Sequence, residues 1–272
     1  RWPVSTKIES ADMTSTASRG LVSLVGAGPG DRALLTLAAA ERLQTADLVL
    51  YDALVSSEVL ELATRAQCFS VGKRAGRRSV RQETIIRLMI RAARRGRHVV
   101  RLKGGDPFVL GRGAEEGLAL RAAGVRFEVV QGVSAAIAAP SMAGIPVTHR
   151  GLASGFVVVS GHDESAYGPA LESLAPASAT VVVLMGLARR REIARCLLDR
   201  GWAPDTSAAI VFAASTPASH TWTGTLEQLA RAAGPSTDGN PGTIIVGAVV
   251  DLATVLASPS ATDAAAAAEG KG

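Results

Sequence analysis

Several residue types that would define a class of protein are scarce in this chain of 272 residues. Its two cysteines, Cys68 and Cys196, are too few for a disulfide framework and lack metal-ligand spacing, so we expect reduced packing residues. Its four histidines are scattered and give no zinc pattern, so we expect no bound metal. No apolar run reaches the roughly 18–20 residues that a membrane span requires. The first 19 residues lack a hydrophobic signal core, and we therefore expect a cytoplasmic protein.

Aromatic residues make up only 4% of the chain although hydrophobic residues make up 47%, so the core must consist of Ala, Val, Leu and Ile. Such a core suits parallel sheets covered by helices, whose strands are short apolar runs. Between residues 20 and 143 such runs alternate with segments of helical periodicity, which predicts a βαβ series and a mostly parallel sheet. The fold class expected is therefore α/β.

This alternation stops at residues 144–151, where Gly144 and Pro146 oppose regular structure, and apolar runs resume after residue 155. We therefore divide the chain into four parts. They are a disordered extension (1–19), an N-terminal α/β domain with glycine-rich loops (20–147), a C-terminal α/β domain (148–258) and a flexible tail (259–272).

Acidic residues are nearly absent between residues 73 and 103, where twelve Lys or Arg accompany only Glu83. The local excess suggests a polyanionic partner, which could be a nucleic acid or a small molecule with several carboxylates or phosphates. Residues 83–95 have helical periodicity that leaves four arginines on a solvated face: Arg87, Arg91, Arg94 and Arg95. The better candidates for ligand contact lie in a glycine-containing loop: Lys73, Arg74, Arg77, Arg78 and Arg81.

Two glycine-rich turns follow predicted strands. The apolar run 99–102 ends in Lys103 and a Gly-Gly-Asp-Pro turn, and glycine lets a ligand approach the backbone closely. Open α/β sheets bind ligands at such strand–turn–helix junctions, although an ordinary connection would have the same sequence. The turn at 26–31 is not a dinucleotide fingerprint because Asp31 replaces the third glycine. Asp31 could cap a helix or contact a ligand.

Six ordered blocks between residues 20 and 250 resemble the uroporphyrinogen-III C-methyltransferases, which belong to the tetrapyrrole methylases. The blocks are Val25-Gly-Ala-Gly-Pro-Gly-Asp31, Asp47-Leu-Val-Leu-Tyr-Asp52, Gly72-Lys-Arg-Ala-Gly76 with Gln82, Val99-Val-Arg-Leu-Lys-Gly-Gly-Asp-Pro-Phe108 with Gly111-Arg-Gly-Ala-Glu-Glu116, Gly144-Ile-Pro-Val-Thr-His-Arg150, and Pro241-Gly-Thr-Ile-Ile-Val-Gly247.

The resemblance implies two α/β domains with an active-site cleft between them, in a homodimer. It implies S-adenosyl-L-methionine as the methyl donor and uroporphyrinogen III as the substrate. Methylation at C2 and C7 would give precorrin-2, on the way to sirohaem or cobalamin. We expect no additional N-terminal nucleotide-binding domain, and so not the form that also oxidises precorrin-2 and inserts iron.

Carried over residue by residue, the resemblance also implies a set of site residues. Cofactor contacts fall on Pro29, Gly104, Gly105, Asp106, Val109, Ser134, Ala135, Met185 and Ala214, the last at a position where glycine is common. The proton acceptor falls on Asp52 and the proton donor on Lys73. Without the resemblance, Asp52 could be a helix cap or an ion-pair partner, Lys73 a loop cation and Met185 a core residue.

The substrate has eight carboxylates, and arginine is well suited to two-point carboxylate recognition. A subset of six arginines is expected to contact these groups: Arg74, Arg77, Arg78, Arg81, Arg112 and Arg150. We expect no nucleic-acid or membrane partner. The alternatives are a precorrin methyltransferase acting at another carbon, an RNA methyltransferase of the same broad fold and, outside enzymes, a nucleotide-sensing module.

Overall fold

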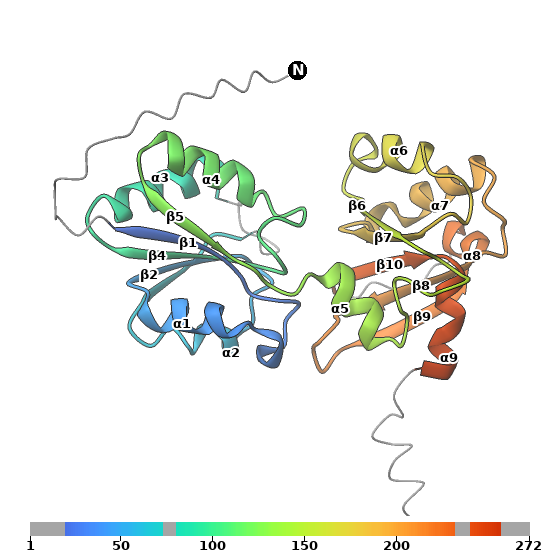
Figure 1. The fold of residues 1–272 in the computed structure, drawn as a ribbon, viewed down its shortest axis with the longest axis horizontal. Helices are drawn as coiled ribbons and strands as arrows, with labels where there is room; N and C mark the ends of the chain where they lie inside the picture. The colour runs from blue at the N-terminus through green and yellow to red at the C-terminus, as the bar shows by residue number, and fades with distance from the viewer. Residues whose placement is uncertain (1–19, 73–79, 232–239, 257–272) are drawn as a thin grey trace, which may run out of the picture.

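The computed structural model describes residues 20–72, 80–231 and 240–256, which form two α/β units, each built on a five-stranded sheet (Figure 1). The first sheet has the strand order β3-β2-β4-β1-β5, and every pairing in it is parallel. The mostly parallel sheet predicted from the βαβ rhythm is therefore confirmed. Its strands are β1 (Leu21–Gly26), β2 (Leu48–Tyr51), β3 (Gln67–Ser70), β4 (His98–Lys103) and β5 (Arg126–Val130).

Helices cover both faces of this sheet (Figure 1). Helices α1 (Leu37–Thr45) and α2 (Ser57–Leu60) pack on one face, where Leu43 contributes to the buried cluster that contains Val100. Helices α3 (Gln82–Ala93) and α4 (Gly113–Ala122) cover the other face. The neighbouring strands β1 and β4 therefore lead to helices on opposite faces. In open α/β sheets the space between two such loops is a ligand-binding position.

The second sheet has the order β6-β7-β10-β8-β9 and is mixed. Only β6 and β7 pair in parallel, whereas β10 is antiparallel to both of its neighbours. Strands β8 and β9 are antiparallel because a short connection without a helix joins them. The strands are β6 (Phe156–Ser160), β7 (Thr180–Leu184), β8 (Ser207–Phe212), β9 (His220–Thr225) and β10 (Gly242–Val246).

Helices α6 (Glu164–Glu172), α7 (Arg190–Asp199) and α8 (Leu226–Ala230) cover one face of the second sheet. Helices α5 (Ala135–Met142) and α9 (Ala253–Leu256) cover the other. Helix α5 precedes the predicted boundary at residue 147, but its Ala139 packs with the second sheet. The limits 20–147 and 148–258 stay a prediction. The predicted extension 1–19 and tail 259–272 lie outside the described residues.

Local details differ from the sequence expectation in several places. The apolar periodicity of residues 33–44 predicts a single helix, but a short 3-10 turn, η1 (Arg32–Leu34), precedes α1 because Asp31 and Thr36 each cap a separate start. Helix α6 was not predicted, because glycine and proline interrupt its pattern. Cys68 is exposed on the edge strand β3, so its assignment as a packing residue is wrong, whereas Cys196 is half-buried. Within the described ranges, the helices are too short or too polar to cross a membrane.

Candidate functional site

The loops after β1, β4 and β5 meet at the carboxyl edge of the first sheet. The Gly105 N–H donates to the Gly28 carbonyl at 2.8 Å, and the Gly28 N–H donates back to the Gly105 carbonyl at 3.2 Å. A Cβ on Gly132 would lie 2.2 Å from the Gly105 carbonyl oxygen, and one on Gly26 would lie 2.5 Å from it. No side chain fits at that separation. Glycine at these positions therefore allows three backbone segments to pack directly on one another.

Asp106 connects two of these loops through its side chain. Its Oδ1 accepts a hydrogen bond from the Phe108 N–H at 2.8 Å, and its Oδ2 accepts one from the Gly132 N–H at 3.1 Å. The sequence predicts Asp106 as a cofactor contact. In the structure both oxygens are bound to backbone N–H groups, so the carboxylate orders the loops around the candidate site.

Other predicted cofactor contacts lie beside this turn. A Cβ at Gly105 would be 3.8 Å from the Ser134 Cα and 3.9 Å from the Ala135 nitrogen. Ser134 caps α5, and its hydroxyl accepts from the Ala136 N–H at 3.2 Å. Gly104 and Val109 are exposed on the same turn. The segments 104–109 and 134–135, which the resemblance assigns to one cofactor site, therefore lie side by side in the structure.

The loop after β1 also contacts the second unit. The Asp31 N–H donates to the Ser215 hydroxyl at 3.0 Å, and a Cβ at Gly30 would lie 3.6 Å from the Ala214 carbonyl oxygen. Pro29 and Ala214, which are 185 positions apart, therefore belong to segments in contact. The Asp31 carboxylate accepts from the Ala33 N–H at 2.7 Å, so its capping role is confirmed.

Unusual backbone conformations concentrate around these segments. Except for Ala177, the non-glycine residues with positive φ in the described chain lie within or next to predicted site segments: Leu110, Arg112, Met185, Ala213 and Ser215. Such conformations cost free energy and occur preferentially at functional sites. Met185 follows β7 with 54% of its surface exposed, so the alternative that it is a core residue is wrong.

Asp52 follows β2 and joins a network of charged side chains. The Arg101 Nη2 donates to its Oδ1 at 2.5 Å, and the Arg101 Nε donates to Glu116 Oε1 at 3.0 Å. Gln82 Nε2 donates to the same Glu116 oxygen at 2.8 Å, and Lys103 Nζ lies 3.2 Å from Oε2. Apart from catalysis, the sequence allows Asp52 to be a helix cap or an ion-pair partner. The contact with Arg101 confirms that it is an ion-pair partner.

Sequence reasoning missed this network as a unit. In the sequence, Arg101 and Lys103 belong to the basic segment and, like Glu116, to a block that resembles the family, but nothing in these patterns pairs them. Burial raises the cost of charging Lys103 and, with the nearby Arg101 cation, lowers its pKa, whereas Glu116 opposes that change. The signal available in the sequence was a pair of cations at alternate positions of an apolar strand, which places both on one face.

In the part of the chain that the structure describes, no hydrogen bond or ion pair connects the predicted substrate arginines with one another. Arg81 is exposed just before α3, and Arg150 is exposed in the connection to the second sheet. Arg112 pairs with Glu115, with Nη2 and Oε2 2.7 Å apart. Lys73, Arg74, Arg77 and Arg78 lie outside the described residues.

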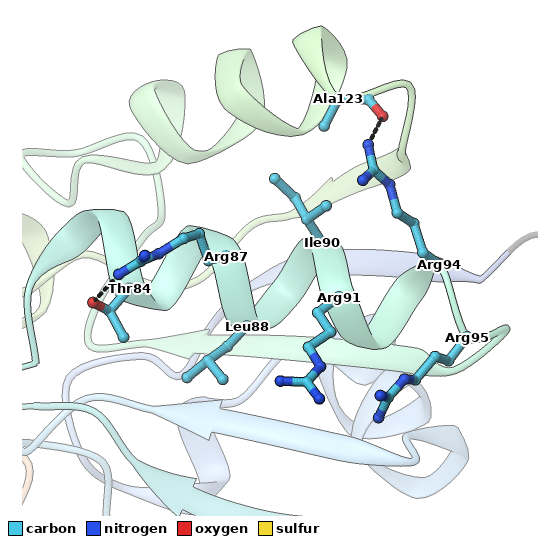
Figure 2. Close-up of a pocket in the computed structure, with 8 residues that line it drawn as sticks. All are labelled: Thr84, Arg87, Leu88, Ile90, Arg91, Arg94, Arg95 and Ala123. Carbon is cyan, nitrogen blue, oxygen red and sulfur yellow. Dashed lines mark hydrogen bonds between the residues drawn. The ribbon is translucent and has the colours of Figure 1, made fainter.

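A surface groove of about 770 Å³ lies elsewhere, along α3 (Figure 2). It is lined by Thr84, Arg87, Leu88, Ile90, Arg91, Arg94, Arg95 and Ala123. The four arginines are exposed, as the helical pattern predicts, and Arg94 donates to the Ala123 carbonyl at 3.2 Å. None of the lining residues belongs to the glycine-loop segments, so this groove is separate from the candidate site.

Comparison with known proteins defines the class. Residues 21–230 match the model of the tetrapyrrole (corrin/porphyrin) methylases, which covers well over half of the chain. The chain belongs to this family and is a methyltransferase. The recognition based on six sequence blocks and the fold of two α/β units are thereby confirmed.

Individual relatives refine the comparison. A sirohaem synthase of Neisseria meningitidis serogroup C is 49% identical over 241 residues, which cover 88% of this chain and 50% of that protein. The chain thus spans about half the length of the curated relatives it matches. The uroporphyrin-III C-methyltransferase of Thermus thermophilus has 45% identity and a TM-score of 0.73 over 85% of this chain and 99% of that one. A structure of that enzyme with S-adenosylhomocysteine gives 45% identity and 0.72 over the same shares.

Proposed function

We propose that the chain transfers methyl groups from S-adenosyl-L-methionine to C2 and C7 of uroporphyrinogen III and so forms precorrin-2 for sirohaem or cobalamin synthesis. The observation that carries the proposal is the junction of the loops at Gly28, Gly105 and Gly132, beside the segment that contains Asp52. The similarity to a C-methyltransferase of Thermus thermophilus, also solved with S-adenosylhomocysteine, supports both the donor and the acceptor.

When bound, S-adenosyl-L-methionine supplies an electrophilic methyl group on a sulfonium. The backbone of residues 104–106 and 134–135 holds this donor, with Pro29, Val109, Met185 and Ala214 completing its surroundings. A substrate carbon held in line with the methyl group needs little further activation, because positioning alone can contribute about 7–11 kcal/mol. These segments act mainly by orientation.

A ring carbon that gains a methyl group leaves a cationic macrocycle, which must lose a proton. Asp52 has 32% of its side chain exposed and can accept that proton directly or through water. Lys73, which lies outside the described residues, is the proposed proton donor. The exposed Arg81, Arg112 and Arg150 are proposed to bind substrate carboxylates, together with Arg74, Arg77 and Arg78.

The proposal includes a homodimer that acts in the cytoplasm on this small-molecule substrate, without a nucleic-acid or membrane partner. The test is incubation with uroporphyrinogen III and methyl-labelled S-adenosyl-L-methionine, followed by mass analysis of the tetrapyrrole. We expect a gain of two methyl groups. No transfer to this substrate, with transfer instead to a later corrin intermediate or to RNA, would refute the assignment.

A further inference from the structure

The network that joins Asp52 to Arg101, Glu116, Gln82 and Lys103 places charged side chains in the interior of the first unit, between its sheet and α4. Arg101 lies in the middle of β4, between β2 and β1, where strands covered on both faces are normally apolar. Its side chain is only 3% exposed, and that of Glu116 is fully buried. Charged side chains are very rarely buried to this extent unless they are paired, because desolvation costs several kcal/mol for each ion.

The Arg101 guanidinium is held on all of its nitrogens. Besides the bonds to Asp52 and Glu116, its Nη1 donates to the Leu50 carbonyl at 3.3 Å and to the Leu102 carbonyl at 3.2 Å. These carbonyls belong to two neighbouring strands, so the group is fixed relative to the sheet. A rigid, planar donor of this kind determines where a carboxylate can sit.

The network is ordered from the interior towards the surface. Glu116 lies at its buried end, where Gln82, Arg101 and Lys103 all approach its two oxygens. Asp52 lies at the end that reaches solvent, one residue beyond β2. The formal charges of the four ionisable members balance, so the interior holds no excess charge while one carboxylate stays accessible.

We propose that Arg101 is a positioning residue that orients the Asp52 carboxylate at the carboxyl edge of the sheet, and that Glu116 and Gln82 hold Arg101 in place. The inference rests on the proposed function in assigning proton transfer to Asp52. It does not make Arg101 a reacting group. Its contribution is the fixed direction of one carboxylate, whose misplacement by about 1 Å can cost roughly 100-fold in rate.

The test compares Arg101→Lys with the wild type in steady-state methyl transfer at varied substrate concentration. Lysine keeps the charge but cannot hold Asp52 and Glu116 together, so we expect kcat to fall by roughly 10- to 100-fold with little change in KM. In an Asp52→Asn background the same substitution should have no further effect. A loss of equal size in both backgrounds would overturn the positioning role.

Arg42→Lys provides a matched control. Arg42 also binds a glutamate through two nitrogens, with Nε 2.6 Å from Glu128 Oε1 and Nη2 3.1 Å from Oε2. Within the described residues, Arg42 and Glu128 form no hydrogen bond or ion pair with the Asp52 network, so the variant should keep its kcat. If Arg101→Lys does not fold, Gln82→Met removes one contact to Glu116 and should lower kcat by a few-fold without a change in KM. An unchanged kcat in Gln82→Met would count against the network.

A readout without turnover separates this inference from the proposed function. Crystal structures of the wild type and Arg101→Lys should differ in the direction of the Asp52 carboxylate. The wild type could fail to methylate uroporphyrinogen III while the Asp52 carboxylate still points in a different direction in Arg101→Lys. In that case the proposed function fails and the positioning role stands. If the carboxylate is unmoved in Arg101→Lys, the positioning role is wrong whatever the substrate.

Discussion

The Asp106 carboxylate accepts a hydrogen bond from the backbone N–H of Gly132, 26 residues further along the chain. This bond joins the loop after β4 to the loop after β5, and the second carboxylate oxygen closes the turn at Phe108. The order of the candidate cofactor site therefore depends on one side chain that does not itself need to touch the cofactor.

Replacement of Asp106 by alanine should weaken binding of S-adenosylhomocysteine at least tenfold and lower the free energy of unfolding by about 1–3 kcal/mol, because two backbone N–H groups lose their acceptor. Calorimetric titration and denaturant unfolding measure the two effects. Asp163→Ala is the control, since Asp163 makes an equivalent bond to the Ser165 N–H at the start of α6. Asp163→Ala should have a lower free energy of unfolding but the same affinity for S-adenosylhomocysteine as the wild type. Unchanged affinity in Asp106→Ala would remove the turn from the site.

A methyl group at Gly132 should separate loops that now touch. Its Cβ would meet the backbone of Gly105 and Gly26, neither of which can rotate away. We expect Gly132→Ala to lose about 1–3 kcal/mol of stability by overpacking and to lose most of its affinity for S-adenosylhomocysteine. In Gly155→Ala the added methyl group meets open space, and both quantities should stay near their wild-type values. If Gly132→Ala and Gly155→Ala have the same stability and the same affinity, the backbone of Gly132 does not pack directly against Gly105 and Gly26.

The buried Lys103 predicts a pH dependence of stability. Burial lowers its pKa in the native state below the value of about 10.4 expected in the unfolded chain. Between these two values the unfolded chain binds more protons, so the contribution of Lys103 to the free energy of unfolding rises with pH. Compared with Lys103→Met, the wild type should therefore gain stability as the pH rises towards about 10.4, the pKa of the unfolded chain. The free energies of unfolding of both proteins are measured by denaturant titration at each pH. If the two change with pH in parallel, the Lys103 amine is not desolvated.

The two cysteines should differ in reactivity. Cys68 is exposed on β3, whereas Cys196 is partly covered within α7. Iodoacetamide should modify Cys68 first. The rate should increase towards alkaline pH, because partial burial raises the thiol pKa of both residues and the thiolate is the reacting form. Peptide mass analysis after short exposure measures the order, and Cys68→Ser should remove the fast phase. Faster modification of Cys196 would contradict the position of β3.

Much of the architecture could be predicted from the sequence. The apolar runs predict strand ends within about three residues of the observed ones, because local hydrophobicity and turn residues determine where buried strands begin and end. The glycine turn at 104–105 was identified as the candidate site for a similar reason. Glycine and proline act locally, so their effect is visible in the order of residues.

The contacts that connect distant segments could not be predicted in the same way. The Asp106 oxygens looked available to a ligand because the position of the Gly132 N–H depends on how β4 and β5 flank β1. Arg101 looked like one more basic residue because its burial depends on α4 placing Glu116 above it. For Pro29 and Ala214, only the resemblance to the family places both in one site, because their segments meet only when both units are folded.

The position of the transferred methyl groups tests the central claim most directly. The protein is incubated with uroporphyrinogen III and S-adenosyl-L-methionine that carries a ¹³C-labelled methyl group, and the product is examined by carbon NMR. The account predicts two labelled methyl groups, one on C2 and one on C7. Label on any other carbon, or a tetrapyrrole that carries no label, would contradict it.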